Sequence, residues 1–277
     1  MMSLYYEASD GTIIDFMSGG IYAQNPETLV ASKWKYKTVS GINGLAKIKK
    51  FYKDAQELPL KLSIMAADAE EFNTIMYRMH RAFERDVRRM RPGKIWWNGF
   101  CLSAFITDNS YSDFEELFES IEKTLTVTTV YPYWVKEIET RFLASEDTVG
   151  TLDFPYDYGF DYDNSEAVEI IENDCIESAN FKIIFYGPAR EPKVTINGHD
   201  YALHTELTEG EYAVVDSTVK KIFKYSQIGE QENIFNSRER DSYIFKKIPE
   251  GTNTILRSKE LGIDIIIFDE RGEPEWI

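Results

Sequence analysis

Short segments rich in β-branched and aromatic residues, separated by turn residues, recur along this 277-residue sequence. Residues 34–39 alternate aromatic and basic side chains, and residues 58–65 alternate apolar and polar ones, as strands with one exposed face do. Asn98-Gly99 is a strong hairpin turn between residues 94–97 and 100–106. Further strand-like segments follow at residues 181–186, 193–196, 212–215, 219–225 and 263–268. The pattern predicts a mainly β protein, with an α+β N-terminal domain and a C-terminal β-sandwich or jelly roll.

One helix interrupts the strand-like pattern in the N-terminal half. Asp68 can cap its first turn and Pro92-Gly93 ends it, so the sequence predicts a helix over about residues 68–91. His80 lies inside this helix, and we expect it to be partly buried. The apolar positions recur at steps of three and four residues and form one stripe: Phe72, Ile75, Met76, Met79, Phe83 and Val87.

Arginines crowd the C-terminal half of the predicted helix: Arg81, Arg85, Arg88, Arg89 and Arg91. Cations near a helix C-terminus complement the helix dipole and pair with surface carboxylates, which is one interpretation of the cluster. In the other interpretation, Arg81, Arg85, Arg88 and Arg89 contact an acidic neighbouring subunit. The sequence leaves both open.

Acidic residues are concentrated in the second half of the chain. The sequence has 31 Lys and Arg against 47 Asp and Glu, a formal net charge of −16. Residues 146–177 contain no Lys or Arg, and aromatic residues alternate with aspartates through 153–163 without helix or strand periodicity. We therefore expect three parts: an N-terminal domain at 1–145, an acidic aromatic connector at 146–177, and a C-terminal domain at 178–277.

Composition and apolar run lengths exclude several classes of protein. An acidic chain is a poor ligand for phosphate backbones, so we expect no nucleic-acid partner. No apolar run approaches the roughly 20 residues of a membrane span, and the N-terminus lacks the basic and apolar regions of a secretory signal. The two cysteines, Cys101 and Cys175, cannot form a disulfide framework and indicate a reducing compartment.

Motifs for catalysis or metal binding are missing from the sequence. There is no P-loop, HExxH, CxxC or GxSxG motif, and His199 and His204 would face opposite sides of one strand, which disfavours a shared zinc ion. We expect no enzymatic activity, no metal and no cofactor; a polysaccharide-cleaving enzyme stays the third alternative because carboxylates are abundant. One acidic cluster could offer oxygens to calcium but lacks the spacing of an EF-hand loop: Asp157, Asp161, Asp163 and Glu166.

Several passages, in this order, resemble the distal tail (Dit) family of baseplate proteins from phages with long, non-contractile tails. They span most of the chain from about residue 90: residues 95–100, 110–112, 125–128, 131–134, 154–158, 184–188, 192–198, 248–255 and 268–276. The resemblance implies a virion structural protein of the tail, assembled in the bacterial host cytoplasm. It also implies a galectin-like fold for the C-terminal sandwich.

The resemblance further implies a homo-hexameric ring between the tail tube protein and the tail-associated hub protein. Its C-terminal domain would carry receptor-binding proteins or contact host surface polysaccharide. A nearly neutral N-terminal half suits a ring closed by heterologous contacts. Our own hypothesis is that the arginines at 81–91 face the acidic stretch at 113–122 of an adjacent subunit.

The alternative is a carbohydrate-binding, lectin-like module that does not assemble into a ring. Surface aromatic residues stack on sugar rings, although in a β-sandwich most aromatic residues belong to the core. The candidate glycan or partner contacts are Tyr156, Tyr158, Tyr201 and Tyr212, with Tyr162 in the same connector.

Overall fold

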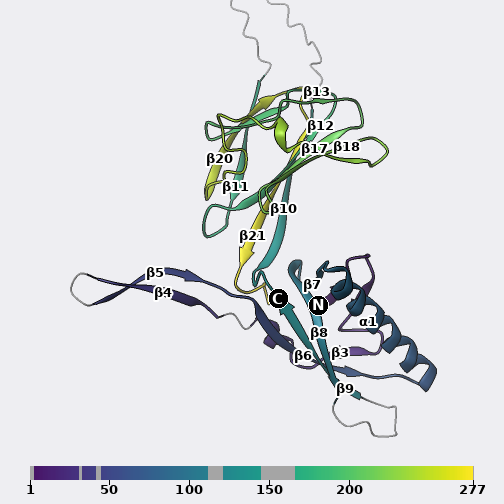
Figure 1. The fold of residues 1–277 in the computed structure, drawn as a ribbon. Helices are drawn as coiled ribbons and strands as arrows, with labels where there is room; N and C mark the ends of the chain where they lie inside the picture. Colours follow the sequence, from purple (N-terminus) through teal and green to yellow (C-terminus); the bar gives the residue numbers. More distant parts are fainter. Residues whose placement is uncertain (1–2, 31–32, 42–44, 112–120, 145–165, 277) are drawn as a thin grey trace, which may run out of the picture. The chain divides into compact units, whose positions relative to one another are not determined.

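The structure is a computed structural model, and it describes residues 3–30, 33–41, 45–111, 121–144 and 166–276. The chain forms two compact units (Figure 1). Unit 1 comprises Met1–Lys136 and Glu270–Ile277, and unit 2 comprises Glu137–Asp269. Unit 2 is therefore an insertion in unit 1, which the last residues of the chain complete.

Unit 1 contains two antiparallel sheets that share one long strand, β8. One sheet has the order β2-β1-β7-β8-β10 and the other has the order β3-β6-β9-β8. The strands are β1 (Leu4–Glu7), β2 (Ile13–Asp15), β3 (Ile21–Ala23), β6 (Gln56–Ile64), β7 (Gly93–Trp97), β8 (Phe100–Tyr111), β9 (Ile121–Thr129) and β10 (Trp134–Phe142). A separate hairpin of β4 (Lys35–Ser40) and β5 (Ala46–Tyr52) and a short 3-10 helix, η1 (Pro26–Val30), complete the unit.

The helix α1 (Ala69–Arg89) packs on the core of unit 1. Asp68 caps it by accepting a hydrogen bond of 2.8 Å from the Glu71 backbone N–H, and Met90 ends it in the left-handed conformation. The apolar stripe that the sequence predicts is confirmed for its first part, because Phe72, Met79 and Phe83 are buried.

The last turn of the buried stripe differs from the expectation. Val87 is 36% exposed, and the preceding residue, Asp86, is fully buried instead. The Asp86 carboxylate accepts hydrogen bonds from the Tyr6 hydroxyl at 2.6 Å and from the Ser9 backbone N–H and hydroxyl. Burial and this carboxylate raise the pKa of Tyr6. The expectation for His80 was wrong: it is exposed and lies 2.7 Å from Glu84, one turn further along.

Unit 2 is a sandwich of two antiparallel sheets with one core between them. The first has the order β19-β18-β17-β12-β21-β10 and the second has the order β11-β20-β14-β15. The strands are β11 (Glu166–Asn173), β12 (Asn180–Tyr186), β14 (Lys193–Ile196), β15 (His199–Ala202), β17 (Tyr212–Asp216), β18 (Lys221–Tyr225), β19 (Gln231–Asn233), β20 (Gly251–Ser258) and β21 (Ile263–Arg271). A short pair, β13 (Ala189–Arg190) with β16 (Glu206–Leu207), and the 3-10 helix η2 (Phe235–Ser237) lie between them in sequence.

The predicted fold class is confirmed: the protein is mainly β, with one α-helix in the described ranges. The unit boundaries differ from the three expected parts at 1–145, 146–177 and 178–277. Strand β11 lies inside the expected connector, and unit 2 begins at Glu137. No alternation marks this strand in the sequence, because acidic and apolar side chains are mixed on both of its faces. Glu166 and Glu172 are exposed, but so are Val168 and Ile170, and Glu169 shares the inner face with buried Ile171. Residues 145–165 of the expected connector lie outside the described residues.

Candidate interaction surfaces

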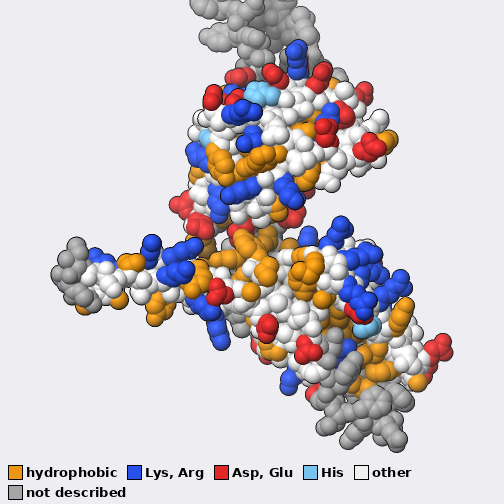
Figure 2. Space-filling view, viewed as in Figure 1, with side chains coloured by type: hydrophobic (Ala, Val, Ile, Leu, Met, Phe, Trp, Pro, Cys, Tyr) orange, Lys and Arg blue, Asp and Glu red, His pale blue; other side chains and the backbone are white. Residues whose placement is uncertain are grey.

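The β4–β5 hairpin of unit 1 forms an exposed two-stranded arm that pairs with neither of the larger sheets (Figure 1). Residues 33–53 contain seven lysines and no acidic residue. In a chain with a net charge of −16, this makes the arm a local excess of positive charge. Figure 2 shows basic and hydrophobic side chains together along the arm.

The register of the hairpin separates these side chains onto two faces. Tyr36 pairs with Phe51 and Thr38 with Ile48, whereas Lys37 pairs with Lys50 and Val39 with Lys47. Cross-strand partners share a face and successive residues alternate. The uncharged face, called the apolar face below, therefore carries Tyr36, Thr38, Ile48 and Phe51, and the opposite, basic face carries Lys35, Lys37, Lys47, Lys50, Val39 and Tyr52.

A bulge maintains this separation. The register shifts between Lys37 and Thr38, so that Lys49 is the extra residue on β5. Without an extra residue, simple alternation would place Ile48 among the lysines and Lys49 beside Phe51. The apolar face is exposed: Tyr36 is 60%, Phe51 55% and Ile48 54% exposed.

The base of the arm is fixed by aromatic and ionic contacts within unit 1. The Lys53 ammonium lies 5.0 Å from the centre of the Trp34 ring and 4.4 Å from that of Tyr133, and burial lowers its pKa. Lys35 lies 2.7 Å from Asp54. The sequence predicted the strand at 34–39 but neither the arm nor its two faces.

The arginine-rich half of α1 lines a shallow surface pocket with Tyr77, His80 and Glu84. Arg81, Arg85, Arg88 and Arg89 all line it. Two of these arginines are paired within unit 1, because Arg85 forms an ion pair with Asp10 and Arg88 with Glu84. Residues 112–120, which hold most of the acidic stretch expected to face them, lie outside the described residues.

The candidate glycan contacts of unit 2 divide into three cases. Tyr201 is 1% exposed and its hydroxyl donates a hydrogen bond of 2.6 Å to the Lys246 carbonyl oxygen, so its assignment as a glycan contact is wrong: it is a core residue. Tyr156 and Tyr158 lie outside the described residues. Tyr212 is half-buried and stacks on Tyr225, with their ring centres 4.9 Å apart.

Tyr212 belongs to a row of three tyrosines across neighbouring strands. Strand pairing sets Tyr186 opposite Tyr212 and Tyr212 opposite Tyr225. Tyr186 is 39% exposed, and its hydroxyl donates a hydrogen bond of 2.7 Å to Asp264. Burial and this carboxylate raise the pKa of Tyr186 to about 12. The sequence did not predict this row because its members are 13 to 39 residues apart.

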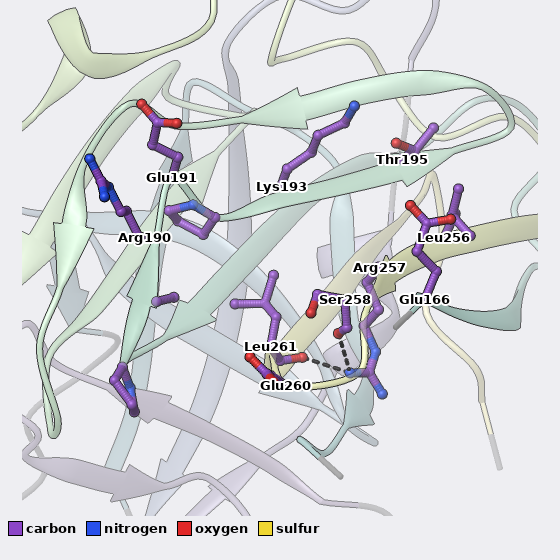
Figure 3. A pocket seen from close by; sticks show the side chains of 13 residues that line it. Glu166, Arg190, Glu191, Lys193, Thr195, Leu256, Arg257, Ser258, Glu260 and Leu261 are labelled. Carbon is purple, nitrogen blue, oxygen red and sulfur yellow. Dashed lines mark hydrogen bonds between the residues drawn. The ribbon is translucent and has the colours of Figure 1, made fainter. Parts of the chain in front are cut away.

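A pocket of about 360 Å³ lies in unit 2 between β13, β14 and β20 (Figure 3). Two of the cations that line it, Arg257 and Lys193, have partners within the protein. Arg257 donates to the Ser258 and Leu261 carbonyl oxygens, as the dashed lines in Figure 3 show, and it also pairs with Glu169. Lys193 lies 2.9 Å from Asp200. We therefore assign no ligand to this pocket.

The two histidines considered for metal binding contact different partners. His199 lies 3.0 Å from the Tyr243 carbonyl oxygen, and His204 lies 3.0 Å from Glu239. Asp157, Asp161 and Asp163 lie outside the described residues, and Glu166 begins β11. Within the described ranges, no group of three or more His, Cys, Asp or Glu side chains is arranged to hold a metal ion. No helix in the same ranges is both long and apolar enough to cross a membrane.

No protein-family model and no curated protein matches this sequence. Solved phage structures match its fold. The crystal structure of SPP1 Dit (gp 19.1), described as a paradigm of the hub adsorption apparatus in phages infecting Gram-positive bacteria, has a TM-score of 0.61 at 12% identity, covering 98% of this chain and 99% of that chain.

Chains of the phage P2 baseplate match as well. The TM-score is 0.65 for the baseplate in its activated conformation with Ca and 0.64 for the one with Sr. Each matching chain is 13% identical to this one, and each match covers 99% of this chain and 100% of the phage chain. The chain therefore has the fold of phage Dit and baseplate proteins along its whole length.

Proposed function

We propose that this protein is a structural component of a phage tail tip, a distal tail protein that joins the tail tube to the hub. The observation that carries the proposal is the extent of the structural match. Both units are covered, at 98% or more of this chain and 99% or more of each phage chain. A likeness of one sandwich alone would fit many functions, but the insertion of unit 2 into unit 1 is a more specific arrangement.

The proposal includes a homo-hexameric ring. A ring needs heterologous contacts, in which one surface meets a different surface of the next copy. Unit 1 offers such a surface in the arm, whose apolar face is more than half exposed at Tyr36, Ile48 and Phe51. Exposed apolar residues that share one face are typical of protein interfaces. Unit 1 would form the ring, and unit 2 would carry receptor-binding proteins on its galectin-like sandwich.

The arginines of α1 are a second proposed contact between subunits. Arg85 is the weakest member because it is already paired with Asp10. Arg81 and Arg89 lie beside Arg88 on the same surface pocket and remain the better candidates. Reversing Arg81 and Arg89 to Glu should weaken assembly, and unchanged assembly would remove this contact from the proposal.

The ring is tested by measuring the mass of the purified chain over a concentration series, with negative-stain images of any large species. We expect a six-fold ring with a central channel. A chain that stays monomeric throughout would contradict self-assembly. Binding to the tail tube and hub proteins, each immobilised separately, then tests the proposed position in the tail of a virion that is assembled in the host cytoplasm.

Carbohydrate binding is the second candidate, and the row of Tyr186, Tyr212 and Tyr225 is the observation that favours it. Partly exposed tyrosine rings offer faces on which sugar rings can stack. A binding measurement with host cell-wall polysaccharide, on the wild type and on Tyr212→Ala, tests it. Saturable binding that the substitution abolishes, in a chain that does not assemble, would favour the lectin. Release of reducing ends would instead indicate a polysaccharide-cleaving enzyme.

A further inference from the structure

We infer that the arm of one copy docks on a specific acidic and apolar surface of the next copy, here called the receiving patch. The receiving patch is formed by Ile13, Met17, Met65 and the first turns of α1. This inference rests on the proposed ring and names the two surfaces that close it.

Exposed apolar side chains mark the receiving patch. Ile13 is 50% exposed, Met65 48% and Met17 39%. They come from three separate segments: strand β2, the turn after it, and the end of β6. Large side chains exposed together in this way are unfavourable in water and are typical of a contact surface.

Backbone packing brings these segments together. The Gly20 carbonyl oxygen accepts a hydrogen bond of 2.8 Å from the Met65 N–H. A Cβ at Gly20 would clash with the Met65 carbonyl oxygen and with the Ile75 side chain, so the turn lies directly between β6 and α1. Arg78 of α1 donates a hydrogen bond of 2.5 Å to the Ile13 carbonyl oxygen, which joins β2 to the same helix.

The charge of the receiving patch is opposite to that of the arm. Residues 13–30 and 62–77 contain no Lys or Arg but include Asp15, Asp68, Glu70 and Glu71, so Arg78, bonded to the Ile13 carbonyl oxygen, is the single cation beside four acids. Asp15 accepts a hydrogen bond from the Met17 N–H, and the other three acids stand at the start of α1. The arm has lysines and no acids, so the charges of the two surfaces are complementary.

The two surfaces also match in layout. The arm has an uncharged apolar face backed by lysines, and the receiving patch has exposed apolar side chains beside carboxylates. Within unit 1 the arm and α1 lie on opposite sides of the sheets (Figure 1). Contact between two such different surfaces is heterologous, and repetition of one heterologous contact generates a ring when the rotation between copies closes.

A charge-swap experiment on the full chain tests the inference. The arm variant carries Lys47→Glu and Lys50→Glu, the patch variant carries Glu70→Lys and Glu71→Lys, and the swap variant carries all four. Lys246→Glu with Lys247→Glu in unit 2 is the matched control, because it changes the net charge as much as the arm variant does at two exposed positions. Circular dichroism confirms that each variant is folded.

We expect the arm and patch variants each to raise the concentration for half-assembly at least about tenfold, and the swap variant to recover most of this loss. The control should assemble like the wild type. Raising the salt from 0.05 to 1 M should weaken wild-type assembly, because screening acts on exposed charges.

The outcomes separate this inference from the proposed function. Rings from the arm and patch variants at wild-type concentrations would overturn the inference and leave the ring itself standing. Loss of assembly in the arm variant that the swap does not repair would overturn the assignment of the patch. A wild-type chain that never assembles would contradict the proposed ring, and the inference with it.

Discussion

Removal of the Arg257 side chain should destabilise unit 2 selectively. This guanidinium is buried, with only 3% of its side chain exposed, on the core-facing side of β20. It pairs with both carboxylate oxygens of Glu169, at 2.8 and 3.0 Å. It also donates to the carbonyl oxygens of Ser258, Leu261 and Leu143. One side chain thus connects strands β11 and β20, the turn before β21, and the end of β10.

The expected magnitude follows from what the substitution leaves behind. Breaking a buried ion pair by removing one partner costs about 3–5 kcal/mol. Glu169 is 30% exposed and can be partly rehydrated, which lowers the loss. The Leu261 carbonyl oxygen loses a buried hydrogen bond of 2.7 Å, and such a group costs about 1–3 kcal/mol when unpaired. We expect Arg257→Ala to cost about 3–4 kcal/mol, and Arg257→Lys about half of that, because Lys keeps the charge but not the paired donors.

The assay uses the distribution of tryptophans. All five, Trp34, Trp96, Trp97, Trp134 and Trp276, lie in unit 1. Tryptophan fluorescence during guanidinium denaturation therefore follows unit 1, whereas far-ultraviolet circular dichroism follows both units. With a slope of about 3–4 kcal/mol per molar, Arg257→Ala should lower the circular dichroism midpoint of unit 2 by about 1 M. The fluorescence midpoint should stay in place.

Two results would refute this reasoning. A shift of less than about 0.3 M for Arg257→Ala would mean that the buried contacts contribute little beyond the apolar packing around them. A midpoint for Arg257→Lys equal to that of the wild type would mean that the paired geometry of the guanidinium is irrelevant. Glu169→Gln is the matched variant: it keeps the shape of the partner, removes its charge, and should also destabilise unit 2, because it leaves the buried guanidinium without its counter-charge.

Three further predictions concern other contacts. Asp86→Ala should lower the free energy of unfolding of unit 1, measured by fluorescence, by about 3 kcal/mol, because the Tyr6 and Ser9 hydroxyls lose a charged acceptor. Asp86→Asn should cost less. Equal stability of the wild type and Asp86→Ala would contradict this prediction. Trp276→Ala should lower the free energy of unfolding of unit 1 by about 1–2 kcal/mol, because the centre of the Trp276 ring lies 5.4 Å from that of Trp97 in an edge-on contact. A loss below about 0.3 kcal/mol would mean that the contact is incidental. Lys224 and the Thr208 N–H lower the pKa of Glu211 to about 2, so the contribution of Glu211 to stability is present above about pH 4.5 and is lost as the pH falls toward 2. The unfolding midpoint of Glu211→Gln should therefore fall less between pH 6 and pH 3 than that of the wild type. Identical falls would refute the assignment.

The fold was predictable from the sequence wherever local patterns determine it. Alternation identified the strands around Asn98-Gly99, and the cap at Asp68 with the stripe through Phe83 identified α1. Each signal comes from residues that are close in sequence, so no knowledge of distant partners was needed. The comparison with solved structures supports the resemblance to phage distal tail proteins, but neither the arm nor the insertion of unit 2 into unit 1 was predicted.

The parts that the sequence could not show depend on distant partners. Asp86 looks like one more surface acid of a charged helix, because Tyr6, its partner, is 80 residues away. The two faces of the arm depend on the single extra residue at Lys49, which simple alternation does not reveal. Tyr201 looked like a surface ring, but its hydroxyl finds the Lys246 carbonyl oxygen in the core. Burial of polar groups is decided by such partners and not by residue type.

The insertion of unit 2 into unit 1 has a consequence for the order of synthesis. Trp276 packs against Trp97, and Asn98 joins the Ser3 N–H to the Glu275 carbonyl oxygen through its side chain. These last residues leave the ribosome after all of unit 2. Domains at the start of a chain usually fold first during translation, but unit 1 acquires its final packing only after all of unit 2 has been synthesised. A chain that terminates within unit 2 therefore lacks the segment that completes the packing of unit 1, so both units are complete only in a chain that contains all of unit 2.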